Sequence, residues 1–336
     1  MSTDPFPQTV IAVIWDFDQT LTPEYMQKPL FDHFGIDMAK FWREVNELPK
    51  FHKRRGFDLI SSDTLYLNHI LTYVRHGEFK GLTNRMLFDL GKDIKFFPGL
   101  PEFFGQISDI PREEPYKSFD LTVEHYIVST GLRKMILGSA IAQHVKGVWG
   151  CEFVSEVPGP NYLDDETAIL DRGLDELSEP GILTDAAMEM EIQDIGYVID
   201  NTTKTRAVFE INKGTNINPD EIPVNAFIPE ESRRVPFNHM IYIADGPSDV
   251  PVFSVVKRFN GTTYAVFKPG DEEGLEQVDT LSKQGRIDHF GEADYTERKQ
   301  TSLWIALKVR QIADKIVESK RNGIKQAVGL PPRHLS

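Results

Sequence analysis

The stretch Val10-Ile11-Ala12-Val13-Ile14-Trp15-Asp16-Phe17-Asp18-Gln19-Thr20 is the most informative part of this 336-residue sequence. Its first five residues are apolar and mostly β-branched, which is typical of a central parallel strand covered on both faces. Two acidic residues, Asp16 and Asp18, follow at the predicted end of that strand. Because the carboxyl ends of parallel strands form the ligand crevice of an open α/β sheet, we expect both carboxylates to face a site.

Further short apolar segments alternate with stretches that have helical spacing. The stretches expected to be helical include residues 132–141 and a helix that begins near 202–205. The alternation predicts an α/β fold, a Rossmann-like doubly wound parallel sheet. The later predicted strands are residues 125–129, 196–200, 240–245 and 262–267.

The chain outside these strands divides into three predicted parts. Residues 23–95 have helix-like spacing and are expected to form a helical insert after the first strand, so that the core comprises 8–22 and 96–275. Residues 157–195 are acidic but lack the spacing of an EF-hand loop, which predicts a solvated insertion. Residues 276–336 are expected to be an extension whose amphipathic helix suits core packing or a homodimer contact.

Composition limits the classes of function. A formal net charge of -14 argues against broad nucleic-acid binding, because no basic surplus is present to neutralise phosphates. No basic segment followed by an apolar stretch opens the chain, and no window has the apolar length of a membrane span, so we expect neither export nor membrane insertion. The single cysteine, Cys151, excludes an intrachain disulfide and fits a cytoplasmic protein.

Polar residues at the ends of later predicted strands form an ordered set with the first motif. Ser129 closes the second strand and is followed by Thr130, Lys204 opens the helix after the third, and residues 245–249 (Asp-Gly-Pro-Ser-Asp) close the fourth. With Asp16 to Thr20, these segments resemble the four motifs of the haloacid dehalogenase superfamily of phosphohydrolases, over roughly residues 9 to 270. Each motif alone has a simpler reading, such as a helix cap for Ser129. All four in order make a specific signal.

The resemblance implies a role for each motif residue. Asp16 is expected to be the nucleophile that becomes an aspartyl phosphate, and Asp18 the general acid and base. Ser129 and the following amide, at Thr130, are expected to bind the phosphoryl oxygens. Lys204 is expected to neutralise the charge on the phosphoryl group and the nucleophile.

The resemblance also implies a divalent cation. Asp16, the backbone carbonyl of Asp18, and Asp245 are expected to bind Mg²⁺ through oxygen, with Asp249 supporting the ion directly or through water. Three positions depart from the common family pattern, namely Gln19, Ala244 and Ser248. None of these departures removes a catalytic group.

The predicted insert resembles the helical C1-type cap of the phosphoserine phosphatase-like branch. In phosphoserine phosphatases a glutamate soon after the first motif binds the substrate's amino group. Here Glu24 stands one position early, and Tyr25 occupies the matching place. Arg54 and Arg55 are candidates for binding a carboxylate of the substrate.

The leading hypothesis is a Mg²⁺-dependent phosphomonoester phosphatase that acts on a small phosphorylated metabolite. Three alternatives stay open. One is a phosphoserine phosphatase, the second is a phosphotransferase to an acceptor other than water, and the third is a non-catalytic phosphate-binding protein on the same fold.

Overall fold

The computed structural model describes residues 6–162 and 185–327. Its centre is a seven-stranded sheet with strand order β4-β3-β2-β1-β5-β6-β7. All neighbouring strands are parallel except β3 and β4, which are antiparallel. The predicted α/β class with a doubly wound, mostly parallel sheet is therefore confirmed. The strands are β1 (Val10–Trp15), β2 (Thr122–Leu132), β3 (Gly147–Val154), β4 (Asp194–Tyr197), β5 (Met240–Ala244), β6 (Thr262–Phe267) and β7 (His289–Glu292).

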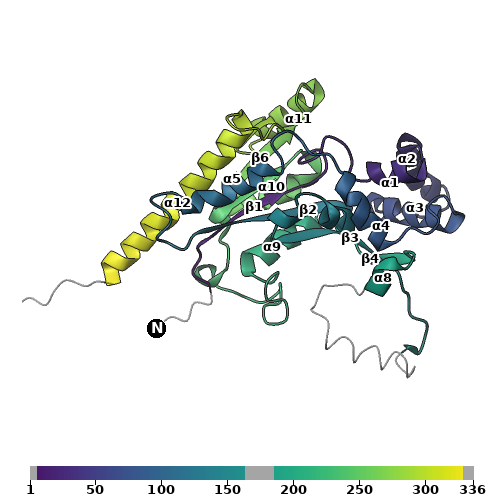
Figure 1. Cartoon of the computed structure of the whole chain (residues 1–336), viewed down its shortest axis with the longest axis horizontal. Coiled ribbons are helices and arrows are strands. Elements are labelled where there is room, and N and C mark those ends of the chain that lie inside the picture. The colour runs from purple at the N-terminus through teal and green to yellow at the C-terminus, as the bar shows by residue number, and fades with distance from the viewer. Residues whose placement is uncertain (1–5, 163–184, 328–336) are drawn as a thin grey trace, which may run out of the picture.

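Helices cover both sides of this sheet. In Figure 1, α5 and α12 lie on one side of the strands and α9 lies on the other. The described α-helices are α1 (Lys28–Phe34), α2 (Met38–Lys53), α3 (Ser62–His76), α4 (Asn84–Leu90), α5 (Glu102–Asp109), α6 (Arg133–Gly138), α8 (Asp185–Glu189), α9 (Thr203–Lys213), α10 (Val250–Arg258), α11 (Glu272–Lys283) and α12 (Gln300–Ala327).

The core forms around β1, whose residues after Val10 are buried. Trp15 is fully buried and packs against Phe104 and Tyr295, with ring centroids 5.2 and 5.8 Å away. Tyr295 also donates a hydrogen bond of 2.7 Å from its hydroxyl to the backbone oxygen of Thr20. Residues late in the chain therefore hold the loop that carries the first motif.

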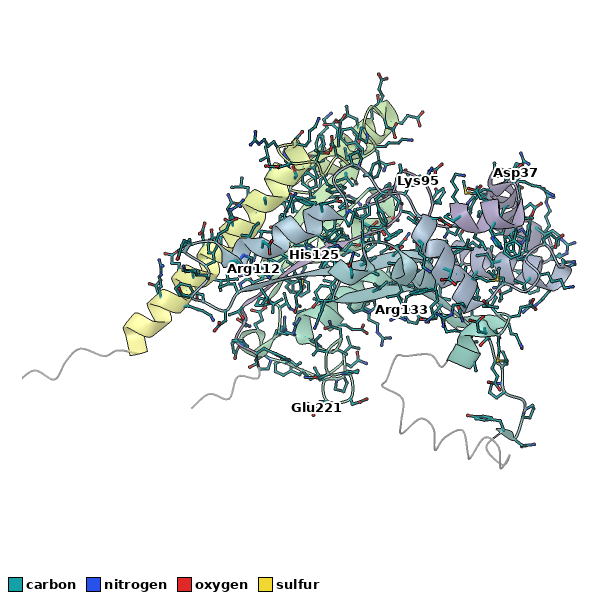
Figure 2. The ribbon with its side chains drawn as sticks, viewed as in Figure 1. Asp37, Lys95, Arg112, His125, Arg133 and Glu221 are labelled. Carbon is teal, nitrogen blue, oxygen red and sulfur yellow. The ribbon has the colours of Figure 1, made fainter. Side chains whose placement is uncertain are left out.

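Helices α1 to α4 lie between β1 and β2 in the chain and occupy one end of the molecule (Figure 1). Asp37 begins α2 by accepting hydrogen bonds from the amides of Ala39 and Lys40, and Figure 2 places it at the outer end of this group. The predicted helical insert after the first strand is thus helical in the structure. The last residues of the predicted acidic insertion contact it, since the Ile192 amide donates to the backbone oxygen of Leu82.

Several local predictions were wrong. Residues 196–200 were predicted to form a third parallel strand. The strand at this place is β4 (Asp194–Tyr197), which lies at the edge of the sheet and pairs antiparallel with β3, so that β3 separates it from β2. The helix predicted at 132–141 is shorter in the structure. Leu132 belongs to β2, and α6 ends at Gly138 because Ser139 has an extended backbone. β7 joins the sheet beyond residue 275, where the sequence placed the end of the core.

Two further predictions concern the acidic insertion and the last helix. Asp164, Asp165, Glu166, Asp171, Asp175 and Glu176 of the acidic insertion lie outside the described residues. On α12, Ile305 and Val309 are buried, whereas Leu303 is exposed, so one face of this helix packs on the core. No helix in the two described ranges combines the length and the apolar character needed to cross a membrane.

Candidate active site

The sheet register brings three of the predicted motifs to one edge. Trp15 is level with Ile127 of β2 and with Ile243 of β5. Asp16 and Asp245 therefore follow the carboxyl ends of β1 and β5, and Ser129 lies in the carboxyl-terminal part of the adjacent strand β2, where an α/β sheet places its ligand site. The Asp16 amide donates to the backbone oxygen of Ile243 at 2.9 Å, which extends the pairing of β1 and β5 to the first acid.

Lys204 joins the remaining motif to this edge. Its ammonium nitrogen lies 2.8 Å from Oδ1 of Asp16 and 2.8 Å from Oδ1 of Asp249. All three side chains are buried, with Lys204 only 1% exposed. Burial acts to lower the pKa of Lys204, but the charges of Asp16 and Asp249 outweigh that effect and raise it. The lysine therefore stays protonated and charged at neutral pH.

The position of Lys204 depends on how α9 begins. The Asp200 carboxylate accepts hydrogen bonds from the amides of Thr202 and Thr203 at 2.8 and 2.7 Å. A carboxylate that satisfies the free amides of a first turn stabilises the helix start. This helix start places Lys204 in the first turn of α9, where its side chain reaches Asp16.

Asp249 is held by more partners than the sequence indicated. Its Oδ1 accepts from Lys204 and from the Tyr242 hydroxyl at 2.5 Å, and its Oδ2 accepts from Ser248 Oγ at 2.7 Å. Tyr242 lies on β5 and is fully buried. The sequence predicted only that Tyr242 belongs to the strand at 240–245. The only signal it offered was a polar tip within an otherwise apolar strand.

Three carboxylates lie close enough to share one cation. Asp16, Asp245 and Asp249 each offer an oxygen, and these three atoms lie within 4.8 Å of one another. Burial raises the pKa of Asp16 to about 6 and that of Asp245 well above its usual range, and Lys204 opposes the shift in both. One lysine does not balance three acids, of which Asp16 and Asp249 are buried and Asp245 is half-buried. A set of hard oxygen donors with excess negative charge fits a magnesium ion.

Asp18 sits in a tight loop after β1. Gln19 adopts a left-handed backbone conformation, with φ of 57°, which turns the chain back toward the sheet. The Met26 amide donates to Oδ1 of Asp18 at 2.8 Å and fixes that carboxyl group. Burial raises the pKa of Asp18 to about 7, the range in which a carboxyl group gives and takes protons at neutral pH.

The carboxyl-terminal part of β2 contacts both the motif loop and the helical insert. Ser129 is buried, and its Oγ accepts from the Gly131 amide at 3.0 Å. The Thr130 carbonyl accepts from the Tyr66 hydroxyl of α3 at 2.6 Å. Gly131 packs directly on Met26, because a β-carbon there would lie 2.1 Å from the Met26 methyl. The two predicted phosphate-binding residues are thus tied to Asp18 through Met26 and to α3 through Tyr66.

The three predicted specificity residues lie away from this centre. Arg54 and Arg55 are exposed after α2, and the Arg55 guanidinium stacks 3.6 Å above the Phe51 ring. Glu24 is exposed and lines a cavity of about 450 Å³ together with Tyr25 and Lys95. Figure 2 places Lys95 on the loop that leads back from the insert. No described hydrogen bond or ion pair joins Glu24, Arg54 or Arg55 to the buried acids.

Two residues that the sequence did not single out for the site lie closer. Asp63, in the first turn of α3, has a pKa that burial and the charge of Asp200 raise and the charge of Lys204 lowers. Tyr25 has a pKa that burial and the charges of Asp18 and Asp245 raise. Both side chains therefore lie within electrostatic range of the site.

No protein-family model matches the chain. An uncharacterized protein of Borreliella burgdorferi (strain ATCC 35210 / DSM 4680 / CIP 102532 / B31) is 38% identical over 307 residues, which cover 90% of this chain and 97% of that protein. The chain belongs to the same family as this protein.

The solved structures found by comparison include a hydrolase and a phosphoserine phosphatase. A haloacid dehalogenase (HAD) family hydrolase from Salmonella enterica subsp. enterica serovar Typhi is 14% identical. Its TM-score is 0.43, and the match covers 85% of this chain and 68% of that one. A phosphoserine phosphatase, solved as a phospho-aspartyl intermediate analogue, is 12% identical, with a TM-score of 0.43 over 84% and 93%. Likeness at this level says nothing about activity.

The α/β sheet and the meeting of the motif residues agree with what the resemblance to the haloacid dehalogenase superfamily implied. The sheet is the mostly parallel α/β sheet that the resemblance implied. Asp16, Lys204, Asp245 and Asp249 come from separate elements and meet in one place. The chemical roles of these residues remain predictions.

Proposed function

We propose that this protein is a Mg²⁺-dependent phosphomonoester phosphatase that acts through an aspartyl phosphate on Asp16. The observation that supports it best is the contact of one buried ammonium, Lys204, with both Asp16 and Asp249 beside a third acid, Asp245. Phosphoryl transfer requires mainly positioning and compensation of negative charge, and this arrangement supplies both.

The proposed reaction has two steps. A carboxylate oxygen of Asp16 attacks phosphorus, and the bond to the leaving alcohol breaks as Asp18 gives that alcohol its proton. Asp18 then takes a proton from water, which attacks the aspartyl phosphate and releases inorganic phosphate. Asp18 is suited to both transfers because its pKa is raised to about 7.

The chain's remaining residues position the phosphoryl group. Lys204 remains charged and compensates its negative oxygens, and the Ser129 hydroxyl and the amide that follows it are proposed to donate hydrogen bonds to them. Asp16, Asp245, Asp249 and the backbone carbonyl of Asp18 are the proposed ligands of the cation. When bound, Mg²⁺ would offset the charge of three acids and of the phosphoryl group.

The test measures phosphate release from a panel of phosphomonoesters, with Mg²⁺ or with a chelator, for the native chain and Asp16→Asn. We expect metal-dependent release from the native chain and none above background from the variant. Asp32→Asn is a matched control, because Asp32 lies on α1 and forms an exposed ion pair with Lys28. Undiminished turnover by Asp16→Asn contradicts the proposal.

We propose that the substrate is a small phosphorylated metabolite. We also propose that the protein acts in the cytoplasm. The reducing cytoplasm suits a chain whose one cysteine, Cys151, is a buried free thiol. Product analysis with added alcohols separates hydrolysis from transfer to another acceptor. Phosphate binding without turnover on any ester favours the non-catalytic alternative.

A further inference from the structure

The first turns of α3 face the candidate site from the helical insert. The Tyr66 hydroxyl is hydrogen-bonded to the Thr130 carbonyl, next to the proposed phosphate-binding hydroxyl of Ser129. Asp63 lies three residues before Tyr66, so the two side chains share one face of the helix. The charges of Lys204 and Asp200 both act on Asp63, which agrees with that placement.

The Asp63 carboxylate has no cationic partner. Within the described ranges no lysine, arginine or histidine forms an ion pair with it, and no other residue's side chain donates a hydrogen bond to it. The nearby ammonium of Lys204 is already bonded to Asp16 and Asp249. A half-buried carboxylate without a partner is unfavourable, and it repels an anionic phosphoryl group. Its presence beside a phosphate site therefore calls for positive charge on the ligand.

An aromatic wall continues from this carboxylate toward the catalytic acids. It consists of Tyr66, which is buried, Trp42, which is half-buried, and Tyr25, which is exposed, with ring centroids 5.8 Å apart between the first two and 5.4 Å between the last two. The Tyr25 end lies within electrostatic range of Asp18 and Asp245. Faces of tyrosine and tryptophan rings attract ammonium groups, most strongly where water is partly excluded.

We propose that the leaving alcohol of the substrate carries an ammonium group, which Asp63 pairs with and the aromatic wall contacts. The substrate class is then the phosphomonoester of an amino alcohol, with a primary or a quaternary nitrogen. The inference rests on the proposed phosphatase function, since the phosphoryl end is taken to bind at Asp16, Ser129 and Lys204. Asp63 is assigned as a specificity residue that leaves the bond-breaking step to Asp16 and Asp18.

The experiment compares esters that differ only in charge. Phosphocholine is paired with its carbon isostere, in which a tert-butyl group replaces trimethylammonium, and phosphoethanolamine is paired with propyl phosphate. We expect kcat/KM of the native enzyme to favour the cationic member of at least one pair by about tenfold or more. The pair that shows the preference identifies the quaternary or the primary nitrogen.

Asp63→Asn is expected to remove this preference by lowering kcat/KM for the cationic ester relative to its neutral partner, while kcat/KM for the neutral esters should not fall, because the lost charge repels their phosphoryl group and has no ammonium to pair with. Asp63→Glu keeps the charge and is expected to retain a preference. Asp58→Asn is the matched control, because Asp58 is an exposed acid in the segment between α2 and α3. Circular dichroism establishes that each variant is folded before its kinetics are compared.

The outcomes separate the two proposals. Equal turnover of charged and neutral esters by the native enzyme, or an unchanged preference in Asp63→Asn, overturns the assignment of Asp63 and leaves the phosphatase function intact. Absence of Mg²⁺-dependent phosphate release from all four esters and from p-nitrophenyl phosphate overturns the proposed function itself, and this inference with it.

Discussion

The ammonium of Lys204 lies 2.8 Å from a carboxylate oxygen of Asp16, although 188 residues separate them in the sequence. The two side chains come from the start of α9 and the end of β1, and both are buried. This pair is the centre of the candidate site. It orients the proposed nucleophile and partly compensates its charge.

Lys204→Gln is expected to lower both activity and stability. Loss of the lysine ammonium leaves Asp16, Asp245 and Asp249 without their buried counter-charge. Breaking a buried ion pair typically lowers the free energy of unfolding by about 3 to 5 kcal/mol. Turnover should fall by about a hundredfold or more, as for other electrostatic contacts to a transition state. Lys92→Gln, at an exposed ion pair with Asp89, serves as the control in urea unfolding and phosphate release. Equal stability of the two variants contradicts the role assigned to Lys204.

Tyr242→Phe is expected to weaken the support of Asp249. The buried hydroxyl donates to that carboxylate at 2.5 Å, and a hydrogen bond to a charged group contributes about 1.5 to 3 kcal/mol. We expect lower free energy of unfolding together with weaker activation by Mg²⁺.

The matched control for this substitution is Tyr116→Phe, which removes a tyrosine–aspartate bond to Asp314 on α12. It should lower stability without altering the magnesium dependence of turnover. The account of Asp249 is contradicted if the two variants have the same magnesium dependence.

Gly131→Ala is expected to reduce turnover, because the new β-carbon would lie 2.1 Å from the Met26 methyl and 2.5 Å from its sulfur. The end of the Met26 side chain would have to move, and the new β-carbon would also lie 3.3 Å from Ser129 Oγ, which would disturb the proposed phosphate-binding hydroxyl. Gly105→Ala on α5 is the control, since open space surrounds that position and alanine favours a helix by roughly 0.5 to 1 kcal/mol. Steady-state kinetics should show a lower kcat only for Gly131→Ala, and an unchanged kcat argues against a role for these contacts.

Acid is expected to destabilise the fold through His125, which Figure 2 places in the middle of the molecule. The Trp15 indole donates to its Nδ1 at 3.1 Å, and its Nε2 lies 3.2 Å from the Phe104 carbonyl. Burial lowers the pKa of His125 from 6.5 to about 3. Between these two pH values the unfolded chain binds a proton that the folded chain does not, so stability falls as pH falls through this window.

Urea unfolding at about pH 7.5 and about pH 5 measures this effect, and His125 alone should account for about 2 kcal/mol of the difference. The pH dependence should be smaller in His125→Gln and unchanged in His76→Gln, where the histidine is exposed. The same pH dependence in both variants would show that His125 is not the group responsible.

Much of the site was predictable because its residues stand at the ends of apolar strands. Asp16 and Asp245 follow β1 and β5, Ser129 lies in the carboxyl-terminal part of β2, and parallel register brings the three together. Lys204 was identifiable from its place at a helix start. These predictions need only local patterns and the general geometry of α/β sheets.

What the sequence did not reveal depends on packing between distant segments. Tyr242 was predicted only as part of a strand, and Asp63 was one polar residue among many in the insert. Arg54 and Arg55 attracted attention by their charge, yet they are exposed. The reversal of β4 also has no local signal, because an edge strand can pair in either direction.

The most direct test of the central claim is mass spectrometry of enzyme quenched in acid during turnover with Mg²⁺. The account predicts one added phosphoryl group on the peptide that contains Asp16, which is absent from Asp16→Asn and from samples with a chelator. Full phosphate release with no modified Asp16 peptide, or with the phosphoryl group on another residue, would contradict it.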